Sequence, residues 1–238
     1  MNEAFEFAKL KLEGSYLIKN FNFSDYRGGF EKLFERDAFL SRGIAFSADE
    51  VFMSTSAKNV IRGLHFQLNQ PQTKLVSVLC GRVLDVIVDL RPESMTFGKW
   101  ISAELSGQNH HALYIPQGFA HGFAALEDGT IMLYQCEGAY DKETDTGIRF
   151  DDPEIGIEWP VAKEAAVCSA RDMRLLSLEE YRKNPMKVLG GGGRCDLKYS
   201  RVPKLFYAVW KSAVLMKYFI FRVGEYICGG RAWCRYAG

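Results

Sequence analysis

From about residue 15 to residue 160, the apolar residues of this chain occur in short runs bounded by Gly, Pro, Asn and Asp. Few of these runs repeat at the helical period of about 3.6 residues, so they indicate β-strands rather than helices. Gly81 separates two of the runs, and we expect a turn there. The runs are Leu75–Cys80, Val83–Leu90, Trp100–Leu105, Ala112–Ile115 and Thr130–Cys136. The pattern predicts an all-β domain built as a sandwich or barrel.

Two segments carry helix signals. Phe34–Ser41 lies in the first third of the chain, and Ser177–Lys183 begins with Ser177 and Glu180 at the spacing of a capping box. We expect both to form short helices at the periphery of the sheets. The chain has no internal repeat with a period of about 20–50 residues.

Residues 186–238 differ in composition from the rest of the chain. They hold ten Lys or Arg residues against two acidic ones, a net charge of +8, so residues 1–185 carry −7 of the total of +1. They also contain the glycine run Gly190–Gly193 and three of the six cysteines. The chain is long enough for one full core. We therefore predict one folded domain at residues 1–185 and a basic C-terminal extension at residues 186–238, for which the sequence specifies no particular fold.

The extension includes the apolar segment Leu205–Val223, which has the length of a membrane span. Lys211 and Lys217 lie within it, and each Lys near the centre of a bilayer costs about 2.5–3.5 kcal/mol, so we expect no span. The extension matches no nucleic-acid-binding or lipid-binding motif, so neither partner is expected.

The first residues of the chain and the cysteine pattern bear on its compartment. Glu3, Glu6 and Lys9 interrupt any apolar run after Met1, which argues against a signal peptide. The cysteines of the first 185 residues are not closely paired. We therefore expect a reduced, cytoplasmic protein.

Two of the four histidines lie in segments that suit a cavity. In Asn59–Gln67, strand alternation sends His65 and Gln67 to one face, and Leu64 and Phe66 to the other. His121 follows a bend framed by Pro and Gly that would aim its imidazole inward. His110 and His111 lie in a polar segment that we expect to be an exposed loop. Taken alone, His65 and His121 are equally compatible with a purely structural role.

The same histidines argue against a metal site. Barrels that hold a metal usually present two histidines one residue apart, with a nearby Glu and a later His, and this chain has no His-x-His. Adjacent residues such as His110 and His111 point to opposite faces of a strand and do not bind one ion together. We expect neither a metal nor another cofactor, and a metal-dependent oxygenase is the least favoured alternative.

Several blocks of the sequence resemble the dTDP-4-dehydrorhamnose 3,5-epimerase family, in family order and spacing. They are Arg62–Gln67, Lys74–Val76, Gly81–Arg91, Ser94–Gly98, Ile115–Phe123, Leu133–Tyr134 and Asp152–Pro160. The resemblance runs from about residue 12 to residue 183. It implies a metal-independent, cupin-type jelly-roll β-barrel, usually a homodimer, that binds a nucleotide sugar. The implied reaction is epimerisation at C3 and C5 of dTDP-4-dehydro-6-deoxy-D-glucose in deoxysugar (rhamnose) and cell-surface polysaccharide biosynthesis.

The resemblance also implies roles for individual residues. By motif position, His65 matches the catalytic base, Asp172 its partner carboxylate and Tyr134 the general acid. Lys74 and Arg62 match cations near the 4-oxygen of the sugar. The other matches are substrate or nucleotide contacts, namely Arg27, Glu31, Gln67, His121, Tyr140 and Arg171.

The chemistry of these residue types fits the roles. Removing a C–H proton beside a ketone requires a base, a cation or donor at the carbonyl oxygen, and an acid on the opposite face. A histidine, which titrates near pH 6.5, suits the base, and a tyrosine, which titrates near pH 10, stays protonated as the acid. Without the resemblance, Tyr134 is compatible with a core position, Lys74 with a solvated strand start and Arg62 with a surface cation.

Two places depart from the family pattern and keep other functions open. Lys32 stands where many members have an acid, with Glu31 one position earlier, and Glu50 and Phe52 stand where Gln and Asn are common. The alternatives are a 3-epimerase or keto-isomerase on a related nucleotide sugar, or a non-catalytic nucleotide-sugar-binding cupin. A binding protein needs no base, carboxylate and acid together, so their joint presence favours an enzyme.

Overall fold

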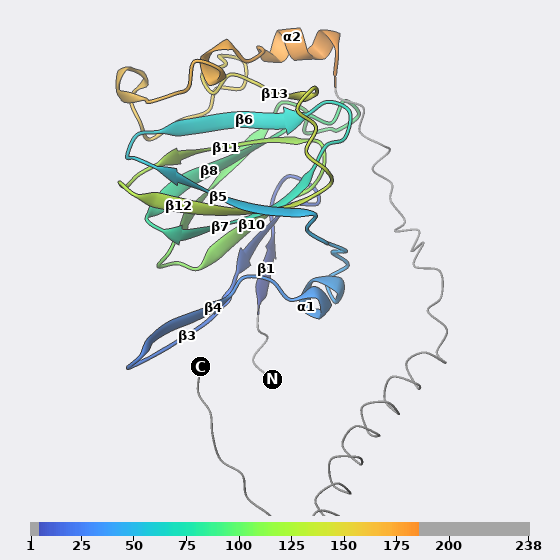
Figure 1. Ribbon diagram of the computed structural model, residues 1–238. Coiled ribbons are helices and arrows are strands. Elements are labelled where there is room, and N and C mark those ends of the chain that lie inside the picture. Colours follow the sequence, from blue (N-terminus) through green and yellow to red (C-terminus); the bar gives the residue numbers. More distant parts are fainter. Residues whose placement is uncertain (1–4, 186–238) are drawn as a thin grey trace, which may run out of the picture. The chain divides into compact units, whose positions relative to one another are not determined.

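A computed structural model describes residues 5–185 of the chain, and Figure 1 shows their arrangement. The C-terminal extension and the segment Leu205–Val223 lie outside the described residues. The regular secondary structure of the described part is almost entirely β-strand. Within residues 5–185, no helix is long and apolar enough to cross a membrane.

Two antiparallel sheets form the body of the domain. The six-stranded sheet has the order β1-β2-β10-β7-β12-β5, and the five-stranded sheet has the order β13-β6-β11-β8-β9. The strands of the first sheet are β1 (Glu6–Lys9), β2 (Tyr16–Lys19), β10 (His111–Ile115), β7 (Thr73–Cys80), β12 (Thr130–Glu137) and β5 (Glu50–Ser56). Those of the second are β13 (Asp145–Gly147), β6 (Ile61–Gln67), β11 (Phe119–Ala125), β8 (Arg82–Asp89) and β9 (Trp100–Ser106). From β5 to β13, consecutive strands alternate between the two sheets, except that β8 and β9 pair within one sheet, and this arrangement is the predicted cupin-type jelly roll.

The apolar faces of the two sheets pack against each other. Val76 from β7, Ile87 from β8 and Phe123 from β11 belong to one buried cluster between the sheets. A second cluster covers the opposite face of the five-stranded sheet and includes Leu64 and Phe66, as strand alternation predicts. Every apolar run predicted to be a strand is one, with ends within about two residues of the prediction.

Short helices lie at the periphery, as expected. Helix α1 (Arg36–Leu40) falls within the predicted segment, and α2 (Leu178–Lys183) begins at the predicted capping box of Ser177 and Glu180. The buried Tyr181 of α2 donates a hydrogen bond to the carbonyl of Leu90 at 2.8 Å. This bond fastens α2 to the end of β8.

Two glycines let β6 and β11 approach closely. A Cβ atom on Gly122 would lie 2.6 Å from the carbonyl oxygen of Arg62, and one on Gly63 would lie 2.5 Å from the Cα of Gly122. Gly63 also has a φ of +125°, a backbone conformation that residues with a side chain rarely adopt. The register of the two strands shifts between His121 and Phe123. As a result, His65 and His121 are direct partners across the ladder.

The first fifty residues differ most from the sequence prediction, which assigned them no strands. Strands β3 (Phe21–Asp25) and β4 (Gly28–Lys32) form a separate two-stranded sheet. In Figure 1 this hairpin extends away from the sandwich. Its aromatic side chains are exposed, namely Phe21, Phe23, Tyr26 and Phe30.

The expectation for His110 and His111 was wrong in part. Both are half-buried, and His111 is the first residue of β10. Nδ1 of His110 lies 3.0 Å from Oε2 of Glu31, so contact with the end of β4 covers this turn.

Candidate active site

A cavity of about 370 Å³ lies inside the sandwich, with walls from both sheets. β5, β7 and β12 contribute to it from one sheet, and β6 and β11 contribute from the other. Most of the predicted site residues line it, namely Arg62, His65, Gln67, Lys74, His121, Tyr134, Tyr140 and Arg171. The jelly roll thus brings together side chains that are far apart in the sequence.

His65 and Asp172 form a hydrogen-bonded pair at the cavity wall. Nε2 of His65 lies 2.9 Å from Oδ1 of Asp172, which belongs to the short 3-10 helix η2 (Asp172–Arg174). The other carboxylate oxygen of Asp172 accepts the backbone N–H of Gly63 at 3.3 Å. Burial pushes the pKa of Asp172 upward, but the bond and charge of His65 and the backbone bond outweigh burial and hold the pKa below its ordinary value. Asp172 is therefore ionised at neutral pH.

His121 forms a second pair, with Asp85 of β8. Nε2 of His121 lies 2.9 and 3.1 Å from the two carboxylate oxygens, and both side chains are buried. Burial raises the pKa of Asp85, and the proximity of His121 opposes the rise. Sequence reasoning did not select Asp85 as a site residue. The signal for it was an acid within the apolar run Val83–Leu90.

The two predicted cations lie on different strands. Lys74 is half-buried on β7, and burial lowers its pKa below the ordinary value, with neighbouring acidic groups opposing the shift. Arg62 is more exposed and is fixed to β5, because its guanidinium donates to Oγ of Ser56 and to the carbonyl of Thr55, each at 3.1 Å. The cavity thus holds one half-buried cation, Lys74, and one anchored cation, Arg62.

Tyr134 projects from β12 into the same cavity. Burial raises its pKa well above the ordinary value, and the nearby hydroxyl of Ser54 opposes the rise. The phenol is therefore protonated throughout the neutral range. Its ring stacks on Phe52 with centroids 4.7 Å apart and contacts the ring of His121 edge-on at 6.0 Å.

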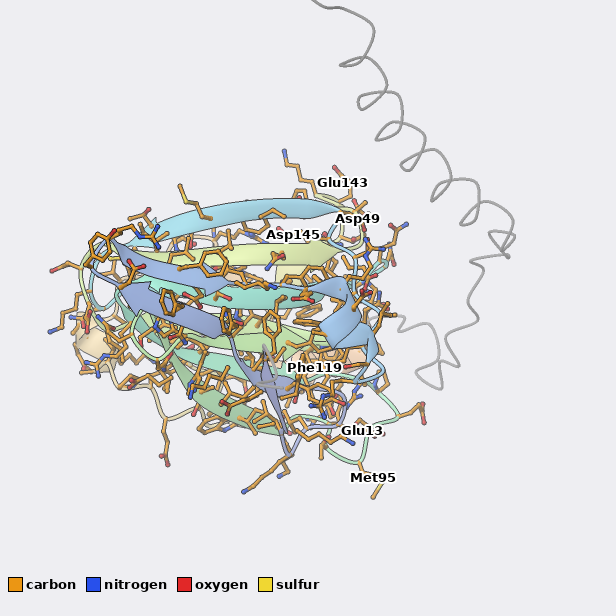
Figure 2. The ribbon with its side chains drawn as sticks, turned by 90° about the horizontal axis from the view of Figure 1, so that it is seen from below. Glu13, Asp49, Met95, Phe119, Glu143 and Asp145 are labelled. Atoms are coloured by element: carbon orange, nitrogen blue, oxygen red, sulfur yellow. The ribbon has the colours of Figure 1, made fainter. Side chains whose placement is uncertain are left out.

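The remaining cavity residues form a polar network around Asp145, which sequence reasoning missed. Oδ2 of Asp145 accepts hydrogen bonds from the hydroxyl of Tyr140 at 3.1 Å and from Arg171 at 2.8 Å. Figure 2 labels Asp145, which lies at the same end of the sandwich as Asp49. Because Asp145 lies in the short strand β13 between polar residues, no sequence pattern distinguishes it.

Gln67 is present in the cavity, but backbone groups occupy its amide. Its Nε2 donates to the carbonyls of Gln70 and Ala139 at 2.7 and 3.2 Å, and its Oε1 accepts the N–H of Asp141 at 2.8 Å. These bonds hold the loop that carries Tyr140 next to β6. In this chain, Gln67 shapes the cavity wall.

Arg27 and Glu31 do not reach the cavity of their own chain. Arg27 follows β3 in the hairpin turn and pairs with Asp25 at 2.6 Å. Glu31 accepts a hydrogen bond from Asn20 at 2.8 Å and contacts His110. The structure therefore separates these two residues from the other predicted ligands.

The site is built from proton donors and acceptors. Within residues 5–185, no group of three or more His, Cys, Asp or Glu side chains is arranged to hold a metal ion. The cavity offers an imidazole with an ionised carboxylate partner, a protonated phenol and two cationic side chains. Together, the jelly roll and this set of groups define a cupin-type enzyme of the acid–base class.

Comparisons with known proteins agree with this class and narrow it. The family described as dTDP-4-dehydrorhamnose 3,5-epimerase matches residues 9–180. A dTDP-4-dehydrorhamnose 3,5-epimerase from Methanothermobacter thermautotrophicus is 41% identical over 183 residues, which cover 76% of this chain and 97% of the relative. The chain belongs to the dTDP-4-dehydrorhamnose 3,5-epimerase family.

Two solved structures are informative neighbours. The first is a dTDP-6-deoxy-D-glucose-3,5-epimerase from Legionella pneumophila in complex with dTDP-4-keto-L-rhamnose. It has a TM-score of 0.72 and 34% identity, covering 77% of this chain and 99% of that one. The second, a 3'-monoepimerase from Streptomyces bikiniensis in complex with dTDP-quinovose, has a TM-score of 0.68 and 27% identity, covering 73% of this chain and 88% of that one. One fold thus accommodates both double and single epimerisation.

Proposed function

We propose that this chain epimerises C3 and C5 of dTDP-4-dehydro-6-deoxy-D-glucose and so forms dTDP-4-dehydro-L-rhamnose. The observation that carries the proposal is the presence of the His65–Asp172 pair, Tyr134 and Lys74 around one cavity. The family relatives supply the identity of the substrate. We further assign the reaction to rhamnose and cell-surface polysaccharide biosynthesis.

The proposed reaction proceeds through an enolate. His65 removes the proton from the carbon beside the ketone, and the C–H electron pair moves onto the carbonyl oxygen. Lys74 and Arg62 stabilise the negative charge that develops on this oxygen. Tyr134 donates its proton to the opposite face of the same carbon, which inverts the centre. Exchange with solvent returns His65 and Tyr134 to their starting protonation states, and the cycle repeats at the second carbon.

Asp172 supports this cycle through His65. Its carboxylate holds the imidazole in one orientation and stabilises the imidazolium that forms when the proton is taken up. A positioned base or acid typically contributes about 10²–10⁴-fold to the rate. Two such groups on opposite faces of the sugar suffice for inversion without a metal.

We also propose that the chain acts as a homodimer. The hairpin of β3 and β4 exposes Phe23 and Phe30, each at 56%, and apolar side chains clustered in this way mark interaction sites. The same hairpin carries Arg27, which does not reach its own cavity. We propose a homodimer in which the hairpin covers the partner and brings Arg27 to the partner's cavity.

The oligomeric state tests this part of the proposal. Light scattering on the intact chain should give the mass of a dimer, and the double variant Phe23→Ser, Phe30→Ser should give a monomer. Met95→Ser is the matched control, because Met95 is fully exposed on a different segment (Figure 2). A monomeric intact chain would refute the dimer.

We place the enzyme in the cytoplasm. The three cysteines within residues 5–185 are Cys80, Cys136 and Cys168, and all are free thiols. Free thiols are compatible with a reducing compartment.

The second candidate is epimerisation at C3 alone. The similarity to a 3'-monoepimerase and the presence of Glu50 and Phe52 in the cavity favour it over a keto-isomerase. A binding protein without catalysis is the third reading. Double epimerisation, epimerisation at C3 alone and binding without catalysis each predict a different exchange of the C3 and C5 protons with solvent.

Solvent-deuterium incorporation into dTDP-4-keto-6-deoxyglucose, followed by NMR, separates these readings. We expect label at C3 and C5 with the intact protein and its loss in His65→Ala, whereas Tyr134→Phe should lose inversion of the two centres, because His65 still exchanges their protons on its own face. His111→Ala, which lies outside the cavity, is the matched control and should behave as the intact protein. Label at C3 alone would establish the second candidate, and no label with the intact protein would contradict epimerisation of this sugar.

A further inference from the structure

Tyr134 does not stand alone in the cavity but is paired with Phe52. In the ladder between β12 and β5, Tyr134 lies directly opposite Phe52. Their rings are nearly parallel, with an interplanar angle of 14° and centroids 4.7 Å apart. Cross-strand partners on the same face of a sheet interact directly, so this stack is built into the register of the two strands.

The ring of His121 borders Tyr134 at another position. It contacts Tyr134 at 6.0 Å with an interplanar angle of 70°. His121 is itself fixed by its bonds to Asp85, so it is a rigid neighbour. Tyr134 is therefore flanked by a stacked ring on the edge strand β5 and by a perpendicular ring on β11.

These two contacts limit how the phenol ring moves. The direction of the Tyr134 hydroxyl follows the plane and tilt of the ring, which the stack on Phe52 restricts. A reacting group that is misplaced by about 1 Å loses as much as 10²-fold in rate, so a fixed hydroxyl is an advantage for proton delivery. Phe52 lines the cavity, yet its side chain has no polar atom that could exchange a proton.

We propose that Phe52 is a positioning residue that holds Tyr134 in the orientation required for proton donation. This proposal depends on the proposed function in one respect, because it takes Tyr134 to be the general acid. Phe52 acts on the proton-transfer step through Tyr134 and contributes little to the binding of the sugar nucleotide.

Replacement of the ring tests the proposal. Phe52→Leu removes the stacking partner but keeps an apolar side chain, and Phe52→Tyr retains the ring. Aromatic pairs contribute about 0.5–1.5 kcal/mol beyond burial, which at about 1.36 kcal/mol per factor of ten corresponds to a roughly two- to tenfold fall in kcat. We expect this fall in Phe52→Leu with little change in KM, and recovery in Phe52→Tyr.

Met53→Leu is the matched control on the same strand. Met53 is 64% exposed and does not line the cavity, so its substitution should change neither kcat nor KM. Thermal unfolding of all three variants separates a loss of positioning from a loss of fold. A rise in KM with unchanged kcat in Phe52→Leu would show a substrate-binding role and overturn the proposal.

A second measurement tests the stack without substrate. In protein with ¹³C-labelled tyrosine rings, the Tyr134 signals are assigned by their absence in Tyr134→Phe. The ring current of Phe52 should shift them upfield, and the shift should be lost in Phe52→Leu but kept in Phe52→Tyr. Unchanged Tyr134 signals in Phe52→Leu would refute the proposal. If the intact protein shifted these signals but placed no deuterium in the sugar, the proposed function alone would fail.

Discussion

The geometry of the His65–Asp172 pair makes a specific prediction about which substitution of Asp172 is more harmful. Oδ2 of Asp172 accepts the N–H of Gly63, and Oδ1 faces Nε2 of His65. In Asp172→Asn, the amide oxygen must remain at Gly63, because an NH₂ group there would meet another donor. The amide NH₂ then faces His65 and donates to Nε2.

This orientation of the amide would disable the base. A neutral imidazole that accepts at Nε2 carries its proton on Nδ1, the nitrogen that is not bonded to Asp172. The lone pair needed for proton abstraction is then absent from the free nitrogen. We therefore expect Asp172→Asn to lose most of the contribution of a general base, about 10²–10⁴-fold in kcat.

Asp172→Ala should be less harmful to turnover, although it removes more atoms. Alanine leaves the tautomer of His65 free and removes only the stabilisation of the imidazolium. A hydrogen bond to a charged group contributes about 1.5–3 kcal/mol, which equals a roughly 10- to 150-fold loss in kcat. The N–H of Gly63 also loses its acceptor, so Asp172→Ala should unfold at a lower temperature than Asp172→Asn.

The assay is the initial rate of deuterium incorporation at saturating substrate, with thermal unfolding measured in parallel. Asp151→Asn is the matched control, because Asp151 forms ion pairs with Arg149 and Lys163 outside the cavity. It should retain the turnover of the intact protein. The reasoning would be refuted if Asp172→Asn turned over faster than Asp172→Ala, or if both matched the control.

Four further predictions follow from other parts of the structure. Because burial lowers the pKa of Lys74, kcat/KM should begin to fall at a pH below 10.5 on the alkaline side of its pH profile. In Lys74→Arg, whose guanidinium stays charged, this alkaline fall should move to higher pH. An alkaline fall at an unchanged pH would exclude Lys74 as its origin. Gly122→Ala should lower the free energy of unfolding by about 1–3 kcal/mol in a urea titration, because its Cβ meets the backbone of β6; full stability would contradict the close approach. Burial pushes the pKa of Asp89 upward, but hydrogen bonds, chiefly from Arg91, hold it below its ordinary value. The stabilisation from the Asp89 carboxylate is therefore full above about pH 4 and is lost as the pH falls through the lower folded pKa. Asp89→Asn should cost about 2–4 kcal/mol at neutral pH and progressively less in acid, as urea titrations at several pH values would show; a cost independent of pH would contradict this. Truncation after Pro185 should leave a folded, active enzyme, and equal expression with lost turnover would overturn the predicted domain boundary.

Most central strands of the sandwich were predictable because burial on one or both faces leaves a strong hydrophobic pattern, whereas β1, β2, β5 and β13 were not predicted. The hairpin of β3 and β4 was missed although Phe21 and Phe23 alternate with polar residues, because its two strands are short and have no buried apolar face within the chain. His110 was misplaced for a related reason: its contact with Glu31 depends on a hairpin that the local pattern does not reveal.

The composition of the site was predictable only from the family resemblance. His65 and Asp172 are separated by 107 positions, and strand periodicity says nothing about contacts over that distance. The resemblance supplied most of the cavity residues, but not Asp85 or Asp145, whose carboxylates bond to other site residues. Such supporting groups are set by tertiary packing, which one sequence does not display.

The two histidine–aspartate pairs differ in their surroundings, and this difference explains why only one pair suits proton abstraction. His65 and His121 are neighbours across the β6–β11 ladder, but their carboxylate partners differ in environment. The pKa of Asp172 is lowered, so it is ionised and able to stabilise a cation on a histidine that is open to the cavity. The pKa of Asp85 is raised by full burial, which penalises the separated charges that a base must create. We infer that His65 takes the proton, and that the buried His121–Asp85 pair packs as a fixed neighbour against the ring of Tyr134.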